Sequence, residues 1–226
     1  MAALAPDIAS VEAAILVLTN AARLEAHAGP LTQNPQLASA ARAYAALLAA
    51  SGRFAHDADG SIDARATRAG YKPCAVAENL ALRRGAGYGV ETLARSTLDG
   101  WLKSPIHHAN LVSAAMTEAG VGVAAVQKPG AAPAYIAVEL FGRPQSAGLT
   151  FRVQNVSGAG VTFWFAGKLH ALASHSTLKL SACAAGPVTF EKSATQAISA
   201  RYDASDGAMF VISGAAGGAV RVEVKR

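Results

Sequence analysis

Residues 100–111 read GWLKSPIHHANL, and this stretch decides the fold that the sequence predicts. Apolar residues at helical spacing lead into it from Val90 to Trp101. Ser104 precedes Pro105, and a residue before proline disfavours the helical backbone, so the helix is expected to break there. We expect Ser104 to cap a second helix that has Pro105 in its first position. Two histidines and an asparagine then lie on its first turns, where free peptide N–H groups and a fixed backbone suit a functional site.

Further helices and a hairpin are expected around this stretch. The predicted helices cover residues 7–27, 34–52, a short segment ending at Gly70, and 90–101. The predicted strands cover residues 119–126 and 134–141, with a hairpin turn at residues 127–130. The first helix should bury a stripe formed by Ile8, Val11, Ile15, Leu18 and Leu24. His27 should interact with the free carbonyls at its end. Residues 72–78 are interpreted as a loop or short turn, and the glycine-rich residues 85–89 as a connector.

The pattern changes at a predicted linker, residues 142–148. Seven short runs follow, many of them alternating apolar and polar residues: 149–154, 161–166, 177–182, 187–190, 198–202, 209–212 and 220–224. Regularly spaced strands of this kind predict a small antiparallel β-sandwich. Three consecutive aromatic residues at 163–165 must point to both faces of their strand, so at least one of them belongs to the core. The predicted domains are therefore residues 1–145 and 149–226.

Six short motifs stand in a fixed order in the first of these domains. They are Phe54-Ala-His56, Gly70-Tyr71, Ala77-Glu78-Asn79, Trp101-x-x-Ser104-Pro105-x-His107-x-x-Asn110-Leu111, Gly120-Val-Gly-Val123 and Phe141-Gly-Arg-Pro144. The set resembles the bacterial branch of the CAP superfamily, which is named after cysteine-rich secretory proteins, antigen 5 and plant pathogenesis-related proteins. Asn20-x-x-Arg23 is similar to the start of that family's domain. The resemblance covers about residues 8–145.

The resemblance implies both a fold and a site. The implied fold class is α+β, with a three-layer α-β-α sandwich ahead of the small antiparallel β-sandwich domain. The family's cleft holds two histidines and two acids, and His56, Glu78 and His107 match three of these four positions. The fourth position, three residues after the tryptophan, is Ser104 here. A hydroxyl is a weaker metal ligand than a carboxylate, so this departure puts a high-affinity metal site in doubt.

The residues His56, Glu78 and His107 allow two kinds of chemistry. Two neutral imidazoles and a carboxylate can bind Zn²⁺ or another divalent cation at about 2.0–2.2 Å. The same three groups can hold a water molecule and move its proton, with Glu78 as base and a histidine as acid. The alternative is a buried polar network in which Glu78 joins loops to the core, and Asn79 and Asn110 are interpreted as structural in that sense. His108 and Glu118 are not expected to join the site.

Three functions remain open at this point. The first is an exported bacterial binding module whose His/Glu cleft takes a divalent cation or a small polar or lipid ligand, while the β domain binds or anchors. The second is a metal- or histidine-dependent hydrolase that acts on a peptide or cell-envelope substrate. The third is a structural or adhesive envelope protein with a vestigial cleft. No Gly-x-Ser-x-Gly, His-Glu-x-x-His or Cys-x-x-Cys motif occurs in the chain.

Composition limits the partners. Of the 226 residues 52% are hydrophobic and 15% are charged, which is enough for a substantial core. The net charge is +5, with 12 basic and 11 acidic residues up to Arg143, and 8 basic and 4 acidic residues from Gly148 onward. These charges are scattered in sequence, so we expect a solvated surface and no nucleic-acid partner.

The first twenty residues match neither a signal peptide nor a membrane span. The family resemblance implies a secreted or periplasmic mature chain. Cys74 and Cys183 either form a disulfide or are separate thiols, and the sequence slightly favours separate thiols.

Overall fold

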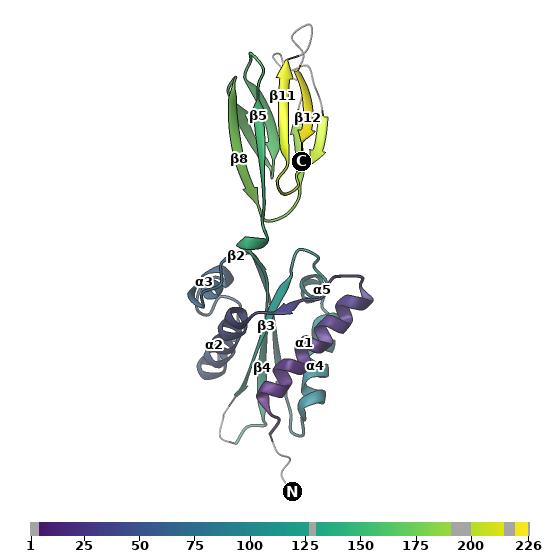
Figure 1. Cartoon of the computed structure of the whole chain (residues 1–226). Helices are drawn as coiled ribbons and strands as arrows, with labels where there is room; N and C mark the ends of the chain where they lie inside the picture. The colour runs from purple at the N-terminus through teal and green to yellow at the C-terminus, as the bar shows by residue number, and fades with distance from the viewer. Residues whose placement is uncertain (1–4, 127–129, 191–199, 215–219, 226) are drawn as a thin grey trace. The chain divides into compact units, whose positions relative to one another are not determined.

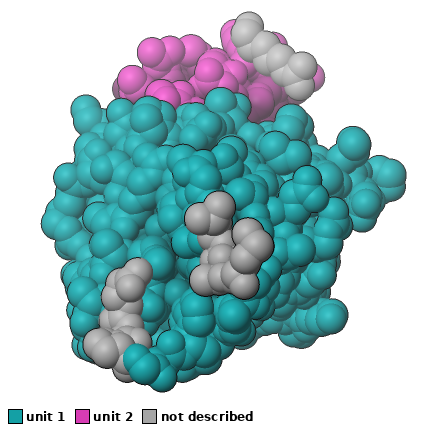
Figure 2. All heavy atoms as spheres, turned by 90° about the horizontal axis from the view of Figure 1, so that it is seen from below, with its two compact units in different colours: residues 1–145 teal, residues 146–226 magenta. Residues whose placement is uncertain are grey.

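The structure is a computed structural model that describes residues 5–126, 130–190, 200–214 and 220–225. The chain divides into two units, residues 1–145 and residues 146–226, which are coloured separately in Figure 2. The elements of the first unit are α1 (Ile8–Glu25), β1 (Thr32–Gln33), α2 (Pro35–Ser51), α3 (Ile62–Arg68), β2 (Pro73–Arg84), α4 (Val90–Leu102), α5 (Pro105–Leu111), β3 (Glu118–Val126) and β4 (Ala134–Pro144).

The first unit is a three-layer α-β-α sandwich, which confirms the predicted fold class. Its sheet has the strand order β1-β3-β4-β2, and α2 covers one face while α1 and α4 cover the other (Figure 1). Strand β4 is buried on both sides: Tyr135 and Ala137 face the α1/α4 layer, and Ile136 and Val138 face α2. A strand covered on both faces is rich in apolar residues, which explains why β4 is apolar from Ala134 to Phe141 except at Glu139.

Two glycines of β3 allow helix α2 to lie directly on the sheet. A Cβ atom added at Gly120 would lie 2.0 Å from the backbone nitrogen of Ala38, and one at Gly122 would lie 2.2 Å from the carbonyl carbon of Ala41. Such distances are far shorter than a non-bonded contact permits. The Gly-Val-Gly-Val motif therefore sets the spacing between an alanine-rich helix and the strand beneath it.

Helix α1 buries Val11 and Ile15 and packs Ile8 and Leu18 against the core, as predicted, but it does not bury Leu24. Leu24 is 76% exposed, whereas Arg23 is 1% exposed. The Arg23 guanidinium donates hydrogen bonds to the carbonyl oxygens of Gly29, Leu111, Ser113 and Met116 at 2.7–3.2 Å. These bonds compensate its burial. The backbone of His27 closes the end of the helix, because its N–H donates a hydrogen bond to the Leu24 carbonyl at 3.0 Å. His27 also has a positive φ of 55°.

The largest error of the sequence analysis in this unit concerns residues 72–78. They do not form a loop: β2 runs from Pro73 to Arg84 and pairs with β4 in antiparallel register, with Glu78 opposite Leu140. Strand β4 also continues through residues 142–144, which the sequence predicts as linker, and a short 3₁₀ helix, η1 (Gln145–Ala147), follows. Residues 127–129 of the predicted hairpin turn lie outside the described residues.

The second unit contains two four-stranded sheets around one core. Its strands are β5 (Leu149–Asn155), β6 (Val161–Phe165), β7 (Lys168–Leu172), β8 (Ser176–Ala182), β9 (Pro187–Phe190), β10 (Ala200–Asp203), β11 (Met209–Gly214) and β12 (Val220–Lys225). The sheet orders are β10-β9-β6-β7 and β12-β11-β5-β8. The four strands of the second sheet are labelled in Figure 1. Phe163 and Phe165 belong to the core, whereas Trp164 between them is 37% exposed. The predicted division of these three aromatics between two faces is confirmed.

Two features of the second unit differ from the prediction. The pairing of β5 with β11 is parallel, so the sandwich is not wholly antiparallel. Strand β7 follows β6 after a turn at Ala166 and Gly167, both with positive φ, and the sequence analysis missed it. Residues 198 and 199, the predicted start of the fifth run, lie outside the described residues. Neither Cys74 nor Cys183 is a free thiol, so the interpretation as separate thiols is wrong.

Candidate functional site

His56 lies in the loop after α2, and that loop is fixed by a buried tyrosine. Helix α2 ends at Gly52, which takes the left-handed conformation with φ 70° that glycine adopts readily. The Tyr44 hydroxyl donates a hydrogen bond to the Ala55 carbonyl and accepts one from the Ala58 N–H at 3.1 Å. Tyr44 is itself 1% exposed. The backbone on either side of His56 is therefore attached to a rigid side chain, while the imidazole is 54% exposed.

Glu78 projects from β2, and its carboxylate is completely buried. Oε1 lies 2.7 Å from Nδ1 of His56, and Oε2 accepts a hydrogen bond from the Arg65 guanidinium. An ionised carboxylate only accepts hydrogen bonds, so Nδ1 of His56 carries the proton and Nε2 is left toward solvent. Both oxygens of Glu78 are thus engaged by neighbouring side chains.

Arg65 of α3 is the residue of this site that the sequence analysis missed. Its guanidinium bonds Glu78, Asp59 Oδ1 at 2.9 and 3.1 Å and the His56 carbonyl at 2.9 Å, and it stacks on the Tyr44 ring. The side chain is only 3% exposed. A signal was available, because a buried Glu78 needs a cation and α3 lies between the two motifs that supply His56 and Glu78.

His107 is placed by a ladder of two asparagines. Asn79, next to Glu78 on β2, donates to the His107 carbonyl at 3.0 Å. Asn110 of α5 donates to Oδ1 of Asn79 at 3.0 Å and to the Glu78 carbonyl at 3.2 Å. The structural role predicted for both asparagines is confirmed. They hold α5 against β2, so that the His107 and His56 ring centroids are 6.5 Å apart with planes inclined at 40°.

Burial shifts the pKa values of two groups in this cluster. Burial raises the pKa of Glu78 above its ordinary value, while Arg65 and the hydrogen bond from His56 act in the opposite direction. Burial lowers the pKa of His107, and the neighbouring His56 lowers it further. A histidine whose pKa lies below its ordinary value is neutral at pH 7. The cluster therefore presents a neutral His107 ring beside the exposed ring of His56.

The arrangement does not fit the predicted metal site. In the described parts of the chain no three or more His, Cys, Asp or Glu residues are grouped so that they could hold a metal ion. Glu78 would have to release Arg65 or His56 to become a ligand, which would leave a buried charge unpaired. Ser104 begins α5 as predicted, but its side chain makes no capping hydrogen bond. Arg65 supplies the positive charge that a metal ion would bring.

The remaining candidates lie elsewhere. Glu118 accepts hydrogen bonds from the Tyr71 hydroxyl at 2.8 Å and from the Asn34 amide at 3.3 Å. Its hydrogen bond and its charge, together with burial, raise the pKa of Tyr71, burial being the largest cause. His108 is exposed. His170 is stacked on the core residue Phe163, with centroids 5.1 Å apart, while His175 is exposed. Among the described residues no helix is both long and apolar enough to traverse a lipid bilayer.

Comparison with known proteins places the first unit. An extracellular protein from Bacillus anthracis that contains an SCP domain matches with a TM-score of 0.51 and 25% identity, over 63% of this chain and 45% of that one. An outer surface protein from Borrelia burgdorferi has a TM-score of 0.48 and 19% identity, with 64% of this chain and 99% of that chain covered. A cysteine-rich secretory protein from Staphylococcus aureus has a TM-score of 0.45 and 20% identity, with 61% and 40% covered.

This chain thus spans less than half the length of the Bacillus anthracis protein. No curated protein matches the sequence. The family model that does match is CAP, described as the cysteine-rich secretory protein family, and it covers residues 16–140. This range holds His56, Arg65, Glu78 and His107 and exceeds half of the chain. The chain therefore belongs to the CAP, or cysteine-rich secretory protein, family.

Proposed function

We propose that this chain is an exported CAP-domain binding module that takes a small polar ligand at the His56–His107 pair, with Arg65 rather than a metal ion as the fixed cation of the site. One observation carries the proposal: the buried Glu78 carboxylate is shared between His56 and Arg65. The likeness to an extracellular bacterial protein at 25% identity supports the exported location.

The two imidazoles are the groups that would touch the ligand. With Nδ1 of His56 bonded to Glu78, Nε2 is the nitrogen of this exposed ring that is left for a ligand. His107 is half-buried, and its lowered pKa keeps it neutral at pH 7. The two rings, whose centroids are 6.5 Å apart, offer hydrogen-bonding nitrogens and apolar faces together. This combination suits a ligand with hydroxyl or amide groups better than it suits an ion.

The direct test is a fragment screen by NMR on the full chain, using a library of small alcohols, amides and carboxylates. We expect hits that shift the imidazole resonances of both His56 and His107. The same hits should leave the spectrum of a His56→Ala/His107→Ala variant unchanged, while an exposed-histidine control, His175→Ala, keeps the response. A library without a single hit at the two rings would overturn the proposal.

The metal question is tested separately by calorimetry with Zn²⁺ on the metal-stripped protein. The proposal expects the same heat for the parent and for the His56→Ala/His107→Ala variant, because Glu78 is already occupied. Zn²⁺ binding that disappears in the double variant would establish a metal site and contradict the role assigned to Arg65.

A histidine-dependent hydrolase is the second candidate, and the 2.7 Å contact between His56 and Glu78 favours it. A buried carboxylate that orients an exposed histidine is the arrangement of a general base and its positioning residue. Glu78 would then orient His56 and would not act as the base itself. The test is the cleavage of a fluorogenic peptide library and of purified cell-envelope fragments. His56→Ala should abolish turnover, and Glu78→Gln should shift the pH dependence of the turnover rate. If the protein cleaves neither substrate set, the hydrolase function is ruled out.

A further inference from the structure

The outward face of the β12-β11-β5-β8 sheet brings together cations that are scattered in the sequence. Arg152 on β5 lies opposite Lys179 on β8 and also opposite Met209 on β11. Met209 in turn lies opposite Lys225 on β12. One row across four strands therefore carries three cations, and all three are exposed. The residues that flank Arg152 in β5 point the other way, into the core.

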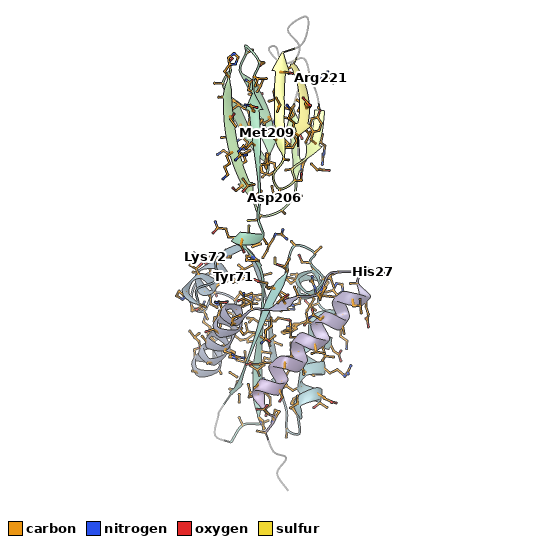
Figure 3. The ribbon with its side chains drawn as sticks, viewed as in Figure 1. His27, Tyr71, Lys72, Asp206, Met209 and Arg221 are labelled. Carbon is orange, nitrogen blue, oxygen red and sulfur yellow. The ribbon has the colours of Figure 1, made fainter. Side chains whose placement is uncertain are left out.

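The next residues along β12 extend this basic face. Arg221 and Glu223 share the outward side of the strand with Lys225, since side chains alternate along a strand. Met209 and Arg221 are marked in Figure 3. The outward strand residues thus comprise four cations and one acid. We call the row Lys225, Met209, Arg152 and Lys179, together with Arg221, the basic face.

The charges of the basic face are only partly balanced, because Glu223 is the one acid among the outward strand residues. Directly opposed residues of an antiparallel pair have Cβ atoms about 4.5–5.5 Å apart, and like charges there are destabilising. Arg152 and Lys179 form such a pair. None of the ion pairs found between described residues involves the cations of this face. An anionic partner would remove a repulsion that the folded chain carries on its own.

The opposite sheet lacks this concentration of charge. On the outward side of β10, Arg201 stands two residues from Asp203, so that one cation and one acid share the strand. The outward row across that sheet is Arg201, Thr189, Trp164 and Leu169. The basic excess of the second unit is therefore specific to one sheet face.

The shape and polarity of the basic face indicate a linear partner. The row crosses three strand spacings of about 4.8 Å each, and it runs perpendicular to the strands. Gln154, Thr177 and Ser181 lie on the same outward side beside it, and their amide and hydroxyl groups can bond sugar hydroxyls. No aromatic side chain stands among the outward residues of these described strands. Stacking of nucleic-acid bases, which is a main source of affinity for single strands, therefore has no platform there.

We propose that the basic face binds an acidic polysaccharide, with its carboxylate or sulfate groups spaced along the row of cations. This function belongs to the second unit and goes beyond the ligand site of the first. The cations attract the polymer through counterion release, and the neighbouring hydroxyl and amide groups select a sugar backbone over other polyanions.

The experiment measures binding of the full chain to polygalacturonate, a linear carboxylate polymer, by calorimetry at several salt concentrations. Arg152→Gln/Lys179→Gln should weaken binding about tenfold, the effect of two exposed ion pairs. It should also reduce the slope of log K against log salt concentration by about one for each cation removed. Lys168→Gln/Arg201→Gln removes the same charge from the opposite sheet and should leave binding within about twofold of the parent.

Three results would overturn the proposal. The absence of binding between the parent protein and polygalacturonate would refute the proposal directly. Equal loss in both double variants would show that net charge alone attracts the polymer. Tighter binding to duplex DNA or to anionic lipid vesicles at the same salt would assign the face to another partner. Thermal melting provides a folding control, because removal of the opposed Arg152–Lys179 pair should not lower the melting temperature.

Discussion

The two units of this chain bury different kinds of side chain. In residues 1–145 the buried groups include Arg23, Arg65, Glu78 and Glu139, all at most 3% exposed. In the described part of residues 146–226 the buried polar residues are the neutral Asn155 and Ser157, and phenylalanines fill the core. A buried charge costs several kcal/mol unless it is paired. The first unit therefore buries titratable side chains, and two of them, Arg65 and Glu78, hold the candidate site. The described part of the second unit has an apolar core and carries its charges on the surface.

The sharpest way to break this comparison is to remove the buried cation of the first unit. Arg65→Met leaves the Glu78 carboxylate buried without its main counter-charge, and we expect a loss of about 3–5 kcal/mol in the free energy of unfolding. The matched control is Arg68→Met, because Arg68 is 55% exposed and pairs only with Asp59. Its loss should stay below about 1 kcal/mol. Urea unfolding measures both, and equal losses would contradict the role of Arg65.

In the second unit the corresponding test uses two adjacent aromatics of β6. Phe163 is fully buried and Trp164 is 37% exposed on the other face. Phe163→Ala should destabilise the unit by about 3–5 kcal/mol through the cavity that it leaves. Trp164→Ala should cost about 1 kcal/mol or less. Thermal melting followed by near-ultraviolet circular dichroism distinguishes the two, and a larger effect at Trp164 would reverse the assignment of the faces.

The close approach of α2 to the sheet gives a smaller effect. Gly122→Ala places a methyl group against the Ala41 backbone and should cost about 1–3 kcal/mol, because α2 must shift outward. Gly158→Ala in the second unit is the control, since nothing lies within 4 Å of the added Cβ. Its free energy of unfolding should change by less than about 0.5 kcal/mol. If Gly122→Ala leaves the free energy of unfolding unchanged, then helix α2 and strand β3 tolerate a wider spacing.

The effect that is smallest over a single pH unit is a gradual dependence of stability on pH. Burial raises the pKa of Glu139 from 4.5 to about 8, although its hydrogen bond from Thr19 and the charge of Arg23 oppose the shift. Between these two pH values the unfolded carboxyl loses its proton while the folded one keeps it, so stability falls as pH rises. The slope should reach about 1 kcal/mol per pH unit. Glu139→Gln should flatten it, and an unchanged slope in that variant would assign the dependence to another group.

Much of the first unit could be predicted from local sequence. The motif around Trp101 and Pro105, the two helix starts at Asp7 and Asn34 and the roles of Asn79 and Asn110 all depend on short-range signals. Strand β2 could not be recognised in the same way. It places Glu78 and Asn79 in buried positions, so the alternation that marks a half-exposed strand is absent.

The features that the sequence analysis missed depend on partners distant in the chain. Arg65 is meaningful only once α3 has been brought over Glu78, thirteen residues further on, by the fold. The basic face requires the register of four strands, which is set by turns and long connections that no local pattern specifies. Scattered charges in a sequence therefore do not exclude a concentrated surface. The basic residues of this face are exposed, as the sequence predicts, and the strand register adds that they lie together on one sheet face.

The parallel pairing of β5 with β11 has a consequence for biosynthesis. Strand β5 is the first of its unit to leave the ribosome, yet its partner residues lie far downstream, with Arg152 beside Met209, 57 residues later. Closing so long a loop is slow, since its entropy must be overcome before the paired strands stabilise one another. The pairing of β5 with β11 therefore cannot form until most of the second unit has been synthesised. The sheet of the first unit has the same requirement, because β1 pairs in parallel with β3, with Thr32 opposite Glu118, 86 residues later.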